Sequence, residues 1–105
     1  MKDSIVVNMK YADYDLIDGT PNVERHHIFG GANRSLSDAD GLWVPLTKEH
    51  HMAGKLSAHI CKTVRVLLQM VGQLAWEKHY YHKLYGNEND PAREAFRQRY
   101  GGSLL

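Results

Sequence analysis

The pattern of apolar and polar positions divides the chain into a β-rich first half and a helical second half. Short runs rich in β-branched or apolar residues at 4–9 (SIVVNM) and 42–46 (LWVPL), and a segment with β character at 23–29 (VERHHIF), predict three strands. The segment 30–41 (GANRSLSDADG) is rich in turn residues and shows no apolar period, so we expect a loop there. The second and third strands flank this loop, which favours a β-hairpin.

From about residue 56 the apolar spacing becomes helical. Intervals of three and four predict a long helix over 56–85, with Gly86 as its stop. Asp90 as N-cap and Pro91 at the first helical position predict a shorter helix over 90–101. The long helix carries one apolar stripe that should face the protein core. The stripe consists of Leu56, Ile60, Val64, Leu67, Leu68, Val71, Leu74 and Ala75.

These elements predict an α+β fold in one domain, 1–105. An apolar content of 43% is ordinary for a globular chain, and no apolar run is long enough for a membrane span. The N-terminus lacks the apolar core of a signal peptide. Cys61 is the only cysteine, which excludes an intramolecular disulfide and a zinc site built on cysteine pairs, and fits a reducing cytosol.

Charge is distributed unevenly behind a net value of +1. Residues 1–50 carry five Lys/Arg against eight Asp/Glu, a balance of −3, and residues 51–105 carry eight against four, a balance of +4. The positive half can face a polyanion such as nucleic acid, or it can be a solvated surface. The candidate nucleic-acid-binding residues are Lys55, Arg93, Arg97 and Arg99.

Histidines cluster in the first half of the chain, where five of the seven lie between residues 26 and 59. Adjacent side chains on a strand point to opposite faces, so one member of the His26-His27 pair can bind a metal while the other faces a reacting group. The pair His50-His51 and then His59 follow the last predicted strand. We expect a metal or catalytic site here, with packing or surface roles as the alternative. For His79 and His82 we expect a surface position or a satisfied position in the core.

The same residues resemble a known family. HHIFGG, an arginine shortly after it, a serine before Gly41-Leu42, VPL and a following HH are similar to HNH nucleases (His-Me finger or ββα-metal endonucleases), most closely a small phage-encoded group. GQLAWE (72–77) and the aromatic-glycine tail support the likeness, which extends from about residue 23 to the C-terminus. The resemblance implies a ββα-metal motif over 23–59, followed by the long and the short helix.

It also implies an activity, metal-dependent hydrolysis of DNA phosphodiester bonds. His26 and His51 would hold one divalent ion (Mg²⁺, Mn²⁺ or Zn²⁺), His27 would be the general base, and Arg34 would hold a phosphate oxygen. His59 is a third ligand only if the chain bends near Gly54, because eight residues of straight helix span about 12 Å.

The sequence departs from the family where Asn-Leu is usual, because Gly41 precedes Leu42. Asp38, Asp40 or a backbone carbonyl is left to orient His27, and we name Asp40 for this role. His50 is a residue of the outer shell, or a fallback ligand.

DNA is the expected partner, with RNA and a homodimer left open, and no membrane is involved. The resemblance implies a phage or prophage protein in the cytoplasm of its bacterial host. Two alternatives remain from other classes. One is a catalytically degenerate nucleic-acid-binding or phage-assembly adaptor that keeps a metal finger, and the other is a purely structural metal site.

Overall fold

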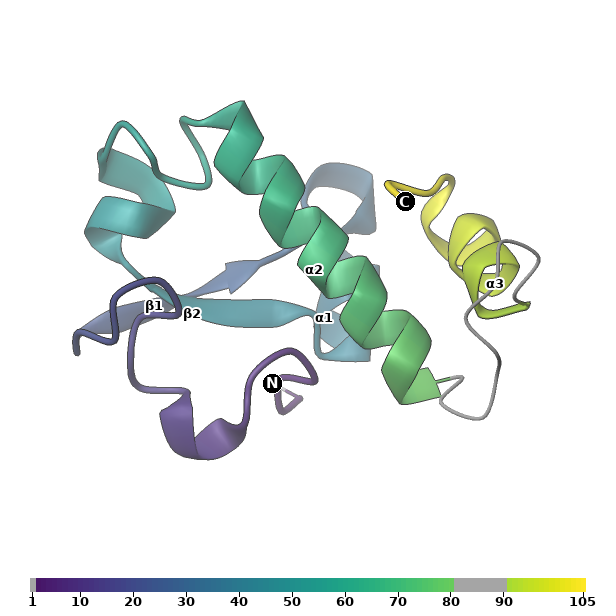
Figure 1. The fold of residues 1–105 in the computed structure, drawn as a ribbon, viewed down its shortest axis with the longest axis horizontal. Coiled ribbons are helices and arrows are strands. Elements are labelled where there is room, and N and C mark those ends of the chain that lie inside the picture. The colour runs from purple at the N-terminus through teal and green to yellow at the C-terminus, as the bar shows by residue number, and fades with distance from the viewer. Residues whose placement is uncertain (1, 81–90) are drawn as a thin grey trace.

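Two antiparallel strands, β1 (Val23–His27) and β2 (Trp43–Thr47), form a two-stranded sheet in the computed structural model, which describes residues 2–80 and 91–105 (Figure 1). The register sets His26 opposite Val44 and His27 opposite Trp43. The described residues combine this sheet with three α-helices and several short helical turns, so the expected α+β class is confirmed. The expected pairing of these two strands is also confirmed, within two residues at each end.

The segment expected to be a loop, 30–41, is partly helical. It contains a 3₁₀ turn, η2 (Gly31–Asn33), and a short helix, α1 (Arg34–Asp40). Gly41 ends α1 with a φ of +74°, in the left-handed region, and its N–H donates to the carbonyl groups of Ser37 and Asp38. Gly41, which was expected to belong to a loop, is therefore the C-cap of a short helix.

The strand predicted at 4–9 is wrong. This segment bends and leads into a 3₁₀ turn, η1 (Met9–Tyr11). Ser4 explains the bend, because its hydroxyl donates to the carbonyl of Trp43 (2.7 Å) and accepts from two backbone N–H groups two and three residues ahead. The apolar residues that follow, Ile5 to Val7, pack against the core from one side.

Helix α2 (Lys62–Tyr80) crosses the hairpin in Figure 1. It begins later than the helix expected over 56–85, because residues 54–61 form turns, and the predicted end at 81–86 lies outside the described residues. Its buried face consists of Leu68, Gly72, Gln73 and Trp76. A Cβ at Gly72 would lie 2.7 Å from Cγ2 of Ile28, so the absence of a side chain lets α2 approach the end of β1 closely.

The apolar stripe predicted for the long helix is mostly exposed. Leu67, Val71 and Leu74 are 55%, 45% and 53% exposed, and the stripe residues that precede α2, Leu56 and Ile60, are exposed as well. The close approach at Gly72 and the burial of Trp76 set the rotation of α2 about its axis. Most of the predicted stripe therefore faces away from the core. No helix among the described residues is long and apolar enough to cross a membrane.

Helix α3 (Pro91–Tyr100) begins at the proline that the sequence analysis placed first in the terminal helix. Its expected N-cap, Asp90, lies outside the described residues. The helix buries Ala92, Phe96 and Tyr100, at intervals of four. The ring of Phe96 stacks on that of Tyr100 (centroids 4.6 Å apart) and meets the edge of Trp76 (5.5 Å), which joins α3 to α2.

The carboxylate of Asp40 links all three α-helices. Its Oδ2 accepts hydrogen bonds from the indole N–H of Trp76 (2.9 Å), Nε of Arg99 (2.6 Å) and the hydroxyl of Tyr100 (2.7 Å), and its Oδ1 accepts from the other arm of the Arg99 guanidinium (2.8 Å). Burial and the bond to Asp40 raise the pKa of Tyr100 above its ordinary value, so its hydroxyl stays a donor. Asp40 itself is 6% exposed.

Replacement of Asp40 by alanine should lower the free energy of unfolding by about 3 kcal/mol, because three donors lose their acceptor at once. Urea denaturation measures this loss. Glu94→Ala, which removes the exposed partner of Arg97 on the same helix, should leave stability unchanged and serves as the control. Equal stabilities of Asp40→Ala and Glu94→Ala would contradict the structural role given to Asp40.

Candidate metal centre

His26 occupies a buried position near the end of β1. The side chain is 5% exposed, and its Nε2 atom has no hydrogen-bond partner among the described residues. A buried polar nitrogen without a partner is costly and uncommon in proteins. It marks a place where a further group is expected, and a metal ion is one group that an imidazole nitrogen binds well.

The chain after β2 brings two more histidines to His26. A π-helical turn, η3 (Glu49–Ala53), carries His51 and ends at Gly54, where the backbone becomes extended. The chain then folds back, so that the N–H of Ala58 donates to the carbonyl of His50 (2.7 Å) and the N–H of His59 to that of His51 (3.1 Å). Residues 51–59 therefore do not form a straight helix. The chain bends at Gly54, as the expected role of His59 as a third ligand requires.

The three imidazoles converge on one point. Ring nitrogens of His26, His51 and His59 lie within 4.8 Å of one another, and Nε2 of His51 is 3.1 Å from Nε2 of His59. Two nitrogens bound to one tetrahedral zinc ion lie about 3.3 Å apart at ordinary bond lengths, so the spacing fits a shared ion. The three residues thus form a group of imidazole donors that could hold a divalent transition metal, and the His51–His59 separation is close to that of two ligands on one ion.

Glu24 contacts the second candidate ligand, His51. It lies two residues before His26, on the same face of β1, and its carboxylate is 2.9 Å from Nδ1 of His51. An acidic partner keeps the proton on Nδ1, which leaves the lone pair of Nε2 directed toward the other histidines.

The protonation states of the cluster also suit a metal. Burial, followed by the charges of His51, His59 and His27, lowers the pKa of His26 to about 4. Burial and the neighbouring His51 and Arg65 lower the pKa of His59 as well. Both imidazoles are therefore neutral near pH 7, and a neutral imidazole is the form that binds a metal.

His27 lies beside this cluster and points to the other face of β1. Its Nε2 is 3.2 Å from Oδ1 of Asp38, on α1. The expectation that Asp40 orients His27 is wrong, because Oδ2 of Asp40 accepts from Trp76, Arg99 and Tyr100, and Oδ1 accepts from Arg99. Asp38, the other aspartate expected to be able to orient His27, is the residue that contacts the imidazole.

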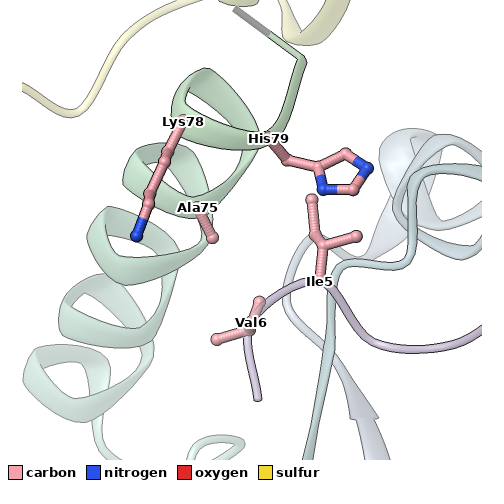
Figure 2. Close-up of a pocket in the computed structure, with 5 residues that line it drawn as sticks. All are labelled: Ile5, Val6, Ala75, Lys78 and His79. Carbon is pink, nitrogen blue, oxygen red and sulfur yellow. The ribbon is translucent and has the colours of Figure 1, made fainter. Parts of the chain in front are cut away.

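A cavity of about 350 Å³ connects these groups. The three clustered histidines, His27 and Arg34 all line it, so the predicted base and the predicted phosphate-binding arginine share one space with the candidate ligands. A larger hollow of about 540 Å³ lies elsewhere, between the N-terminal segment and α2 (Figure 2). Lys78 and His79 are its ionisable lining residues, and Ile5, Val6 and Ala75 are apolar, so it carries no comparable group of ligands.

His50 points away from the cluster although it adjoins His51. Its Nδ1 lies 2.9 Å from Asp15, whose carboxylate also accepts from the N–H groups of Thr47, Ile17 and Asp18. Burial alone would raise the pKa of Asp15, but these hydrogen bonds lower it to about 2. Asp15 thus ties the N-terminal segment to the end of β2 through Thr47 and to η3 through His50. His50 contributes neither a fallback ligand to the cluster nor a contact to His27.

The basic residues predicted to bind nucleic acid lie apart from the cavity lining. Lys55 is exposed in the turn after Gly54. The three arginines of α3 are each engaged by a carboxylate: Arg93 pairs with Glu77, Arg97 with Glu94 and Arg99 with Asp40. Binding of a phosphate by any of these arginines would compete with an ion pair inside the molecule.

Two further residues lie at the site, Glu24 and Arg25, and neither was among the predicted site residues. Strand alternation is the signal that could have found both, since it places Glu24 on the face of His26 and Arg25 on the face of His27. Comparisons with protein-family models, with curated proteins and with solved structures give no match to this chain. The HNH resemblance therefore rests on the residues of the sequence alone and stays a prediction.

Burial of His26 should make the metal-free protein less stable in mild acid. The unfolded chain binds a proton near the ordinary pKa of 6.5, and the folded chain only near 4, so stability falls as the pH drops between these values. We expect a loss of about 2.5 kcal/mol between pH 7.5 and 4.5, measured by urea denaturation with a chelator present. His26→Asn should show a shallower dependence, and equal slopes for the two proteins would refute this origin.

Proposed function

We propose that this protein is a metal-dependent nuclease of the ββα-metal type, which hydrolyses phosphodiester bonds of DNA. The observation that carries the proposal is the shared cavity. Three imidazoles with converging nitrogens line it together with a fourth imidazole that is held by a carboxylate and stands outside the cluster. A site that only stored a metal would have no need for the fourth imidazole and its carboxylate.

His26, His51 and His59 would hold the ion. Three neutral imidazoles favour a transition metal such as Zn²⁺ over Mg²⁺, which prefers oxygen ligands. When bound, a divalent ion at this point supplies positive charge that neutralises the scissile phosphate and stabilises the leaving oxygen. Glu24 contributes by keeping Nε2 of His51 free to bind.

His27 would accept the proton of the attacking water. It has one side toward the cavity and one nitrogen at Asp38, so the carboxylate fixes the ring and stabilises the imidazolium that forms when the proton arrives. Arg34 comes from the start of α1 and lines the same cavity. Its guanidinium offers two parallel N–H groups to oxygens of a phosphate.

A nicking assay tests the proposal. The purified protein should convert supercoiled plasmid to the open circular form with Zn²⁺ or Mn²⁺, and less effectively with Mg²⁺, and EDTA should abolish the conversion. His27→Ala should reduce kcat by about 10² to 10⁴, the usual contribution of general-base catalysis. His79→Ala is the matched control, because it removes an exposed histidine at the far hollow and should leave the rate unchanged.

Other outcomes favour the alternatives. Tight binding of DNA without cleavage under any of these metals would favour the adaptor that keeps a metal finger. A large rise in Tm on metal addition, with neither binding nor cleavage of DNA, would favour a structural metal site. Equal rates for wild type and His27→Ala would refute the role of His27 even if cleavage occurs.

Asp38→Asn should lower kcat by about tenfold to a hundredfold and leave KM and metal affinity nearly unchanged, because the substitution removes only the support of the base. Steady-state kinetics on a labelled duplex, with metal affinity measured separately by Co²⁺ absorption, distinguish these effects. Asp13→Asn, the same change at an exposed aspartate of the N-terminal segment, provides the control. A fall in metal affinity for Asp38→Asn would show that Asp38 acts on the cluster instead.

A further inference from the structure

Arg25 lies in β1 two residues before His27 and therefore on the same face of the strand. Its guanidinium carbon is 4.1 Å from the centre of the Trp43 ring, and Trp43 is the residue directly opposite His27 in the sheet. Trp43 is fully buried, and its indole N–H donates to the carbonyl of Lys2 (2.8 Å). The cation thus rests on a rigid aromatic surface beside the proposed base.

Arg25 has no acidic partner. Within residues 2–80 and 91–105, no carboxylate forms an ion pair with Arg25 or with Arg34, whereas every arginine of α3 has one. Glu24, which adjoins Arg25 in the sequence, contacts His51, and Asp38, which follows Arg34 by four residues on α1, contacts His27. Stacking on an aromatic face leaves the N–H groups at the guanidinium edge available for a ligand.

Both unpaired arginines line the cavity of the histidines. A cation in this position attracts an anion, and its fixed placement reduces the entropy that binding would otherwise cost. Planar guanidinium groups suit the oxygens of a phosphate, which they contact through two parallel hydrogen bonds. An exposed arginine that is pre-positioned and lacks an internal partner is therefore better suited to grip a nucleic-acid backbone than the paired arginines of α3.

We propose that Arg25 binds a backbone phosphate of the DNA strand that enters this cavity, adjacent to the phosphate that is hydrolysed. The inference rests on the proposed function and extends it, because it names the residue that holds the substrate strand beside His27. It also moves the DNA-binding surface from α3 to the open face of β1 and the start of α1.

The test compares two charge-removing variants. Arg25→Met keeps an unbranched apolar stem over Trp43 and removes the charge, and Arg97→Met removes one exposed arginine from α3. Both are made in the His27→Ala background, so that a fluorescein-labelled DNA duplex can be titrated without cleavage, and anisotropy gives Kd over a series of salt concentrations. Thermal melting confirms that each variant is folded.

Arg25→Met should raise Kd about tenfold, and the slope of log Kd against log salt concentration should decrease by about 0.9, the value for one lost phosphate contact. Arg97→Met should change neither quantity. With His27 restored, Arg25→Met should raise KM and leave kcat within about twofold, since the contact is present in both ground and transition states. Arg25→Lys should recover part of the affinity.

An unchanged Kd and slope for Arg25→Met would overturn the inference, and so would an equal weakening by Arg97→Met, which would indicate a diffuse positive field. The failure of the proposed function looks different. If wild type binds the duplex and cuts no plasmid, hydrolysis is wrong while the Kd comparison still decides the role of Arg25. If wild type nicks plasmid and both variants bind normally, only the inference about Arg25 is wrong.

Discussion

The buried carboxylate of Asp40 is the constraint on which the arrangement of the helices depends. It stands at the end of α1 and accepts hydrogen bonds from α2 through Trp76 and from α3 through Arg99 and Tyr100. A buried charge is stable only when it is paired and hydrogen-bonded, so the three helices can close over Asp40 in few ways. The position of α1 in turn places Asp38 against His27. Core electrostatics and the candidate site are thus joined through one short helix of seven residues.

Each histidine pair is divided by the local backbone. In β1, alternation buries His26 and leaves His27 on the other face of the strand, toward Asp38. In η3, His51 approaches Glu24 and His59, while His50 approaches Asp15. Two sequence pairs that look alike therefore arise from different geometry, and one member of the second pair holds the N-terminal segment in place instead of serving the cluster.

Much of the fold could be predicted from the chain because several signals are local. The terminal helix was predicted correctly from Pro91 at its first position. The two strands were predicted correctly from the β-forming residues around 23–29 and 42–46. Helix α1 was missed because its residues are polar and its cap, Gly41, reads as a turn in isolation. The exposed face of α2 was assigned to the core because apolar spacing of three and four marks a helix but cannot tell which of two apolar faces is buried; Gly72 and Trp76 decide that through tertiary contacts. At the site, residue types predicted the histidine cluster, but the choice of Asp38 over Asp40 needed the three-dimensional positions of the helices.

The turn that closes residues 51–59 has a consequence for the order in which a metal would be acquired. His51 and His59 are close along the chain and are brought together by two backbone hydrogen bonds of a local turn, whereas His26 belongs to β1, which is held in place by its pairing with β2. A two-histidine turn can capture an ion weakly before the sheet is formed, and the arrival of His26 then completes the set. Tight binding of an ion would then require that β1 and β2 be paired. A measurement of metal affinity would therefore also report whether the strand that carries His27 is correctly assembled.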